Sequence, residues 1–170
     1  GMLVAITGGT GFLGRRLAAL HAGRGDRVRI FKRPGAPAVH AHTGVEIVEG
    51  DVSVNDGQLR RFVDGADVLY HCAAEVRDES AMEATNVRGT RLVAQLAAGR
   101  IGRWVQVSSA SVYGAPRAGT LTEESPVQPD SLYGRTKVEA ETIARAAAMD
   151  GGFGISVVRP SNIFGIGMTG

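Results

Sequence analysis

Short apolar runs alternate with segments of helical periodicity along the whole chain, and this alternation constrains the fold more than any other feature. Strands are expected at residues 3–7, 27–31, 45–49, 67–71, 103–108 and 154–159. Helices are expected from the glycine turn to about residue 24, over 53–63, from 81 to about 98, and from 131 to 148. Such alternation favours an α/β fold, in which a doubly wound parallel sheet carries helices on both faces.

The stretch ITGGTGFLG, residues 6–14, lies between the first expected strand and the first expected helix. Gly9, Gly11 and Gly14 fit the spacing G-x-G-x-x-G, while Gly8, Gly11 and Gly14 fit G-x-x-G-x-x-G. Glycine lacks the Cβ that would keep a ligand away from the backbone, and the free N–H groups at a helix start favour a pyrophosphate. We therefore interpret the stretch as a dinucleotide-binding loop, with a plain strand-to-helix turn as the alternative.

Two basic residues, Lys32 and Arg33, follow the second expected strand. An acid at this place, roughly 20 residues after the glycine turn, bonds the ribose 2′-OH of NAD in dinucleotide-binding folds. A basic pair instead attracts a 2′-phosphate, so we predict a preference for NADP over NAD; the alternative is a solvated pair at a strand end. Asp51 follows the third expected strand. There it would either accept a hydrogen bond from the adenine amino group or cap the next helix.

Tyr133 and Lys137 lie one helical turn apart at the start of the last expected helix, so both side chains face one way. A phenol with a pKa of about 10 is a poor base at neutral pH, and a neighbouring ammonium would stabilise the phenolate and lower that pKa. The pair is therefore a candidate proton donor and acceptor, with an ordinary surface pair as the alternative. Ser108, Ser109 and Ser111 follow the fifth expected strand, where a hydroxyl would hydrogen-bond a substrate oxygen.

Several short motifs, taken together and in order, resemble those of the extended short-chain dehydrogenase/reductase family, also called the NAD-dependent epimerase/dehydratase family. They are TGGTGFLG at 7–14, GDV at 50–52, HCAA at 71–74, NVRGT at 86–90, SSASVYG at 108–114, YGRTK at 133–137 and RPSNIFG at 159–165. The resemblance implies a Rossmann-type sheet, a nicotinamide cofactor and hydride transfer at a carbinol or carbonyl carbon.

The resemblance also implies roles for individual residues. Tyr133 would be the catalytic acid or base, Lys137 its partner, and Ser109 would hold the substrate oxygen. Cofactor contacts would come from the glycine turn, the strand ends and the catalytic helix: Gly8, Gly11, Phe12, Leu13, Gly14, Lys32, Arg33, Asp51, Val52, Ala73, Ala74, Tyr133, Lys137, Pro160, Asn162 and Ile163. We interpret His71 and Cys72 as packing at a strand end, and Asn86 as structural.

Two features divide the resemblance between branches of the family. Lys32 stands where many sugar-nucleotide epimerases carry an acid, and the basic pair is similar to that of NADP-dependent ketone reductases acting on flavonoids or steroids. The motifs SSASVYG and RPSNIFG are more similar to the epimerase branch. We expect an NAD(P)-dependent epimerase or dehydratase acting on a sugar nucleotide. The alternatives are an NADP-dependent ketone or aldehyde reductase, and a non-catalytic NADP-binding sensor or scaffold.

Residues 2–170 are expected to form one NAD(P)-binding domain, the N-terminal part of a longer family member, because nothing in them supplies a smaller C-terminal substrate domain. The basic residues are scattered and the net charge is only +2, so we expect no nucleic-acid partner. No apolar stretch approaches the roughly 18 residues that span a bilayer. We expect a small-molecule substrate and no metal, and a homodimer is allowed. The single cysteine, Cys72, fits the reducing cytoplasm.

Overall fold

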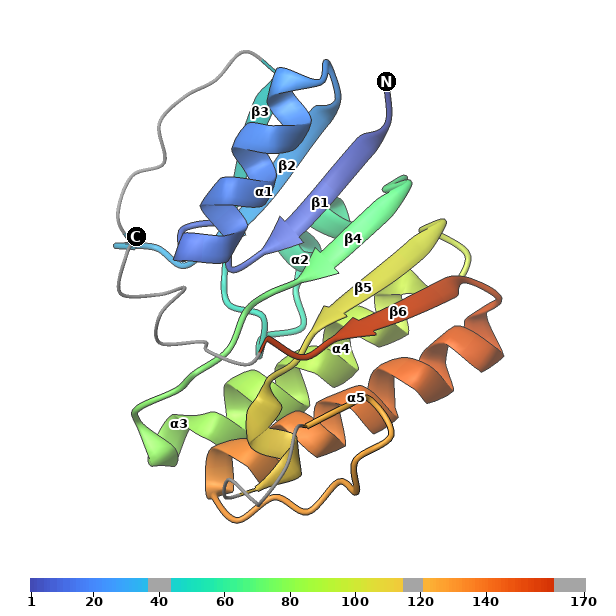
Figure 1. Ribbon diagram of the computed structural model, residues 1–170. Helices are drawn as coiled ribbons and strands as arrows, with labels where there is room; N and C mark the ends of the chain where they lie inside the picture. The colour runs from blue at the N-terminus through green and yellow to red at the C-terminus, as the bar shows by residue number, and fades with distance from the viewer. Residues whose placement is uncertain (37–43, 115–120, 161–170) are drawn as a thin grey trace.

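Six strands form one parallel sheet in the computed structural model, which describes residues 1–36, 44–114 and 121–160. The strands are β1 (Leu3–Thr7), β2 (Arg27–Lys32), β3 (Val45–Glu49), β4 (Val68–His71), β5 (Arg103–Val107) and β6 (Gly154–Val158). Their order across the sheet is β3-β2-β1-β4-β5-β6 (Figure 1). The order reverses between β1 and β4, and doubly wound sheets bind ligands in the crevice at such a reversal. All six strands were expected from the sequence within about one residue.

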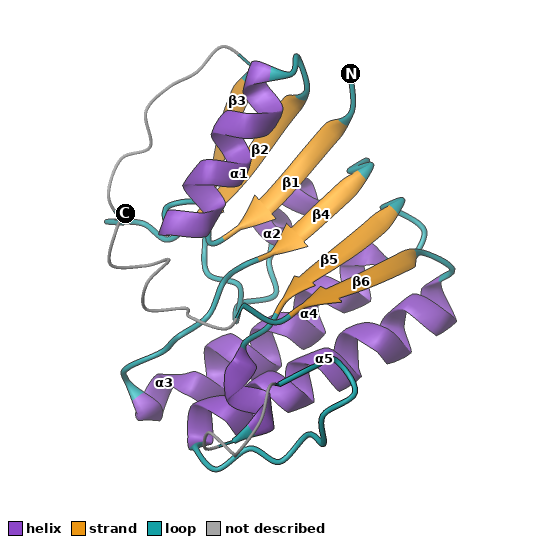
Figure 2. Cartoon of the chain, viewed as in Figure 1, coloured by secondary structure: helices purple, strands orange, loops and turns teal. Residues whose placement is uncertain are grey.

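Helices lie on both faces of this sheet, as the alternation of elements predicts (Figure 2). The α-helices are α1 (Phe12–Gly23), α2 (Gly57–Val63), α3 (Glu79–Met82), α4 (Gly89–Ala97) and α5 (Leu132–Gly151). A π-helical turn, η1 (Glu83–Arg88), joins α3 to α4, and a 3₁₀ turn, η2 (Ala110–Tyr113), follows β5. The Rossmann-type fold class is therefore confirmed.

Two apolar clusters hold the layers together, one on each face of the sheet. On one face α1 packs on β1 and β2 through Ala18, Ile6 and Ile30. On the other face α2, α4 and α5 pack around the fully buried Trp104 and Phe62. The helices thus pin the strands from both sides and fix where the carboxyl ends of β1, β4 and β5 meet.

Two expected helices begin elsewhere because of capping residues that the apolar pattern does not reveal. The helix expected over 53–63 begins at Gly57, since the Asp56 carboxylate accepts the N–H groups of Gln58 and Leu59. The helix expected from 81 begins at Glu79, since the Asp78 carboxylate accepts the N–H of Ser80. That helix is also interrupted by the π-turn η1, which an apolar period of 3.6 cannot foretell.

Candidate functional site

A cavity of about 310 Å³ opens at the carboxyl ends of β1, β2, β3 and β4. Its wall is made by the glycine turn, by the residues that follow the next strands, and by the segment after β4. The lining residues are Gly8, Thr10, Gly11, Phe31, Lys32, Arg33, Ala36, Gly50, Val52, Cys72, Ala73, Ala74 and Glu75. The cavity therefore lies where the strand order reverses, which is the ligand-binding place of such a sheet.

The fold itself constrains three of the four motif glycines, Gly8, Gly9 and Gly14, but not Gly11; a Cβ on Gly9 would collide with the Ile30 side chain. Gly8 has a φ of +67°, and a Cβ there would lie 2.8 Å from the N atom of Ala73. A Cβ on Gly14 would collide with the Gly8 carbonyl. Gly11, in contrast, is the N-cap of α1 with φ −74° and ψ 170°, and its Cβ would meet only the Gly8 carbonyl, at 3.4 Å.

The open space at Gly11 fits a dinucleotide. No side chain caps the first turn of α1, and no acid lies in that turn, so its N–H groups are available to an anion. Phe12 and Leu13, expected as cofactor contacts, supply two of these backbone groups and are half-buried. The chemistry and shape of the cavity thus suit a pyrophosphate lying against the start of α1.

The two basic residues of the cavity differ in how far they are already paired. The Lys32 ammonium donates to the Ala36 carbonyl at 3.3 Å and lies 3.9 Å from a Glu49 carboxylate oxygen. Arg33 is exposed and donates to the neutral hydroxyl of Thr85 at 3.2 Å. The Arg33 guanidinium has N–H groups left to donate to an incoming anion and contacts no carboxylate directly, although its charge also acts on Asp51, whereas the Lys32 ammonium lies beside Glu49.

Asp51 does not cap α2, because Asp56 does; this removes one of the two roles considered for it. Its Oδ1 instead accepts hydrogen bonds from the backbone N–H and the hydroxyl of Ser53. Burial alone would raise the pKa of Asp51, but the Ser53 bonds and the charges of Arg33 and Arg88 outweigh burial and lower the pKa. Asp51 is thus held as an anion beside the cavity, next to Val52 in its wall.

The phenol of Tyr133 lies at the start of α5, which Ser131 caps by accepting the N–H of Gly134. Its hydroxyl is buried and has no hydrogen-bond partner among the described residues. Burial raises the pKa of Tyr133 to about 12, and the nearby Ser109 hydroxyl opposes that rise. Ser109 is thus close enough to act on the phenol, although no hydrogen bond of good geometry joins the two groups.

Lys137 is fully buried one turn further along α5, and its ammonium donates to the carbonyl of Val107 at 3.0 Å. Burial lowers the pKa of Lys137 to about 8, while Cys72 and Glu141 oppose the lowering. Cys72, which opposes this lowering, lines the first cavity.

One expectation about this pair is wrong for the structure as it stands. The ammonium was expected to lower the pKa of Tyr133, yet the pKa is raised and Lys137 is not among its causes. The physical reason is that the charge is directed at the Val107 carbonyl while burial penalises the phenolate.

Of the three candidate serines, the structure brings Ser109 to the phenol. The Ser108 hydroxyl donates to the buried carboxylate of Glu141, and this charged bond holds its proton more strongly than the neutral Ser111 hydroxyl holds the proton of Ser109. The Ser109 hydroxyl accepts the N–H of Ser111 and donates to its side chain at the start of η2. Gly134 makes this approach possible, because a Cβ there would lie 2.6 Å from the Ser111 carbonyl.

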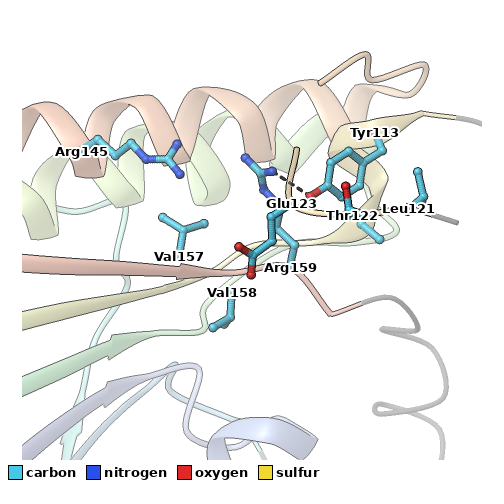
Figure 3. A pocket seen from close by; sticks show the side chains of 9 residues that line it. Tyr113, Leu121, Thr122, Glu123, Arg145, Val157, Val158 and Arg159 are labelled. Carbon is cyan, nitrogen blue, oxygen red and sulfur yellow. Dashed lines mark hydrogen bonds between the residues drawn. The ribbon is translucent and has the colours of Figure 1, made fainter. Parts of the chain in front are cut away.

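An ion pair joins the buried Glu141 on α5 to the half-buried Arg159. Arg159, which follows β6, donates through Nε and Nη2 to both carboxylate oxygens of Glu141. Its Nη1 donates to the Tyr113 hydroxyl at 2.9 Å (Figure 3). The pair ties the ends of β5 and β6 to α5. It also borders a second cavity of about 640 Å³, which shares no lining residue with the first.

The structure brings only part of the expected cofactor set into one wall. Gly8, Gly11, Lys32, Arg33, Val52, Ala73 and Ala74 line the cavity. Gly14 packs beneath the glycine turn, and Pro160 accepts the N–H of Ala110. Asn162 and Ile163 lie outside the described residues.

Six lining residues were not singled out as cofactor contacts: Thr10, Phe31, Ala36, Gly50, Cys72 and Glu75. Gly50 and Cys72 belong to the motifs GDV and HCAA, so those motifs carried the signal. Phe31 could have been found from its place directly before Lys32. A Cβ on Gly50 would lie 2.6 Å from the Phe31 ring, so only glycine fits at this position while the ring keeps its place.

Within residues 1–36, 44–114 and 121–160, no helix has the length and apolar character needed to cross a membrane. The same part of the chain holds no cluster of histidine, cysteine or acidic side chains suited to a metal ion.

Comparison with known proteins agrees with this geometry. The family described as "NAD dependent epimerase/dehydratase family" matches residues 4–170. A dTDP-glucose 4,6-dehydratase of Streptomyces griseus is 30% identical over 94% of this chain and 54% of its own length. A 3 beta-hydroxysteroid dehydrogenase/Delta 5-->4-isomerase of Mycobacterium tuberculosis is 36% identical over 96% of this chain and 48% of its own length.

Among solved structures, DesIV, a dTDP-glucose 4,6-dehydratase from Streptomyces venezuelae solved with NAD bound, aligns with a TM-score of 0.83. It is 32% identical, and the alignment covers 93% of this chain and 55% of that one. The chain thus spans about half the length of the curated relatives it matches.

Proposed function

Because the chain belongs to the NAD dependent epimerase/dehydratase family, we propose that it binds NADP or NAD in the first cavity and takes part in hydride transfer at a carbinol or carbonyl carbon. The proposed substrate class is a nucleotide sugar, as in the dTDP-glucose 4,6-dehydratases that resemble the chain. The cofactor, when bound, supplies the redox step at the substrate carbon.

In this proposal the chain binds, orients and moves a proton. Gly11 and the first turn of α1 hold the pyrophosphate, and Ala73 supports the cofactor from the segment after β4. The Ser109 hydroxyl holds the substrate oxygen, and Tyr133 exchanges a proton with it. The proposal makes Lys137 the partner of Tyr133 in this step, which requires its ammonium to turn from the Val107 carbonyl, its present acceptor, toward the phenol.

The observation that carries the proposal is the Tyr133 hydroxyl, which is buried beside Ser109 without a partner among the described residues. A buried polar atom without a hydrogen bond costs about 1–3 kcal/mol, so such an atom marks a place that a ligand completes.

The test is a screen of nucleotide sugars and ketones against NAD(H) and NADP(H). Conversion is followed by product analysis and by absorbance of the reduced cofactor. Turnover that Tyr133→Phe lowers by about 10²–10⁴-fold supports the proposal. Full activity of that variant removes Tyr133 from the chemistry.

We further propose a preference for NADP, with Arg33 as the residue that pairs with the 2′-phosphate. Its guanidinium lies in the cavity wall and is bonded to a neutral hydroxyl, whereas the Lys32 ammonium lies near Glu49. Arg33→Ser is then expected to weaken NADPH binding about tenfold and leave NADH binding unchanged, since a solvent-exposed charged hydrogen bond contributes at the lower end of its usual range. Lys32→Ser serves as the matched control. Tighter binding of NADH than of NADPH by the wild type would contradict the preference.

A second candidate function is an NADP-dependent ketone or aldehyde reductase. The basic cavity wall favours it, as do relatives named for steroid and dihydroflavonol substrates. Net consumption of NADPH with a ketone separates this function from an epimerase, which consumes none.

A third candidate is a sensor or scaffold that binds cofactor without catalysis. The Tyr133–Lys137 pair argues against it, and cofactor binding with no turnover of any substrate class would favour it.

A further inference from the structure

A continuous chain of buried hydrogen bonds runs from the glycine turn to the catalytic helix. Thr7, the last residue of β1, bonds Nδ1 of His71 at 2.8 Å, and His71 Nε2 bonds the hydroxyl of Thr90 at 2.9 Å. Thr90 donates to the carbonyl of Asn86, whose side-chain amide donates to Thr136 on α5. Each of these five side chains is at least 95% buried, so each hydrogen bond has a fixed role.

The bonds of Thr7 determine which nitrogen of His71 carries the proton. The Thr7 hydroxyl oxygen accepts the backbone N–H of Cys72 at 3.0 Å and that of Ala73 at 3.1 Å. Both of its lone pairs are therefore used, and its own proton is left to donate to His71. Nδ1 of His71 must then be the acceptor, without a proton.

The bonds of Thr90 lead to the same conclusion from the other side of the ring. Thr90 donates its only hydroxyl proton to the Asn86 carbonyl at 2.7 Å. The Thr90 oxygen can therefore only accept from His71, so Nε2 of His71 carries the proton. Burial, with a smaller contribution from the charge of Lys137, lowers the pKa of His71 to about 3, and the ring is neutral.

This arrangement bears on the cavity. Cys72 and Ala73, which Thr7 holds by their N–H groups, lie in its wall directly opposite the Gly8 backbone. A Cβ on Gly8 would lie 2.8 Å from the Ala73 N atom, so the glycine turn and the segment after β4 are already in close contact. A shift of this segment therefore changes the space available to a ligand.

We infer that His71 is a positioning residue for the cofactor. Its Nδ1 accepts a hydrogen bond from the Thr7 hydroxyl and so fixes the orientation of that hydroxyl. In this orientation the Thr7 oxygen accepts the N–H groups of Cys72 and Ala73, which line the cavity. The inference rests on the proposed binding of NAD(P) in that cavity.

Two variants of His71 separate positioning from bulk stability. The Oδ1 atom of Asn lies at about the place of Nδ1, so His71→Asn keeps an acceptor for Thr7 and loses the donor to Thr90. The Nε2 atom of Gln lies at about the place of the histidine Nε2, so His71→Gln keeps the donor to Thr90 and loses the acceptor for Thr7. Each variant loses one hydrogen bond and the ring, and a merely structural role predicts equal effects of the two on stability and on binding.

The inference predicts unequal binding. Cofactor dissociation constants are measured by titration calorimetry with NADPH and NADH, and free energies of unfolding by urea denaturation. His71→Gln should weaken binding about tenfold relative to His71→Asn, the factor that one ordinary hydrogen bond carries. Equal dissociation constants for the two variants would overturn the inference. A wild-type chain that binds neither cofactor would contradict the proposed function itself.

A second readout needs neither cofactor nor variant folding. In ¹⁵N-histidine NMR spectra of the wild type, the His71 ring should show an unprotonated Nδ1 and a protonated Nε2, unchanged down to about pH 5. The neighbours that bear on it are Thr7, Thr90, the Lys137 charge and the ring of Trp104, whose centroid lies 5.2 Å away. A proton on Nδ1, or titration near the ordinary histidine pKa, would overturn the inference whatever the cofactor measurements show.

Discussion

A side chain placed at Gly11 should remove cofactor binding while leaving the fold intact. The backbone at Gly11 has φ −74° and ψ 170°, which any residue adopts, and the nearest atom to a Cβ is the Gly8 carbonyl oxygen at 3.4 Å. Gly11→Val should therefore change the free energy of unfolding by less than about 1 kcal/mol. The valine methyl groups would instead occupy the space in front of the first turn of α1.

The loss of affinity follows from the bonds that the valine prevents. A pyrophosphate at a helix start accepts hydrogen bonds from backbone N–H groups, and a charged hydrogen bond contributes about 1.5–3 kcal/mol. Loss of two such bonds amounts to at least about 3 kcal/mol, or a rise of more than about 100-fold in the dissociation constant. Titration calorimetry with NADPH and NADH measures the affinity, and urea denaturation measures the stability.

Gly14→Ala is the matched control, because it adds a side chain to the same motif but in a place that the fold fills. Its Cβ would collide with the Gly8 carbonyl and would lie 2.8 Å from the Gly9 Cα. It should cost about 1–3 kcal/mol of stability. Normal affinity in Gly11→Val would refute the reasoning, since the phosphate would then lie elsewhere. A Gly11→Val chain that unfolds would refute the claim that only a ligand requires this glycine.

Three further predictions concern α5. Lys137→Met should stabilise the chain by roughly 3 kcal/mol below pH 8, since the pKa of Lys137 falls from 10.5 to about 8 on folding. Between pH 8 and pH 10.5 the unfolded lysine holds more protons than the folded one, so the stability of the wild type rises with pH. The stability gained by Lys137→Met therefore vanishes above pH 10.5. A gain that does not depend on pH in urea denaturation would contradict this reasoning. Tyr133→Phe should leave the NADPH dissociation constant within about twofold of the wild type, because the phenol contributes to proton transfer and not to cofactor binding. A large loss of NADPH affinity in calorimetry would assign Tyr133 to cofactor binding instead. Glu141→Gln should cost about 1.5–3 kcal/mol in urea denaturation, because it removes the charged partner of the half-buried Arg159, whereas Glu139→Gln at an exposed position should cost less than about 0.5 kcal/mol. Equal costs for the two variants would show that the Glu141–Arg159 pair contributes nothing to stability.

The sheet could be predicted because its strands are short apolar runs between clear breaks. LVAIT and VEIVE, for example, were placed to the residue as β1 and β3. The starts of two helices could not be predicted as well, because they depend on backbone N–H groups that the Asp56 and Asp78 carboxylates accept and not on apolar spacing. The π-turn at Glu83–Arg88 leaves no mark in the periodicity at all.

The site was predictable where a motif fixes a backbone shape, and less so where burial decides the chemistry. Gly8 and Gly11 reach the cavity wall as the spacing indicates. The pKa of Tyr133 could not be foreseen, since it depends on how deeply the phenol is buried and on Lys137 donating to Val107 instead. His71 was interpreted as packing, because a sequence does not reveal which groups its two nitrogens meet.

The central claim is that the glycine turn and the Tyr133–Lys137 pair serve one bound dinucleotide. A crystal structure of the chain with NADPH tests it most directly. The account predicts the diphosphate against Gly11 at the start of α1 and the nicotinamide ring beside Tyr133 and Lys137. A ring far from that pair, or a nucleotide bound outside the cavity at the ends of β1 and β4, would contradict it.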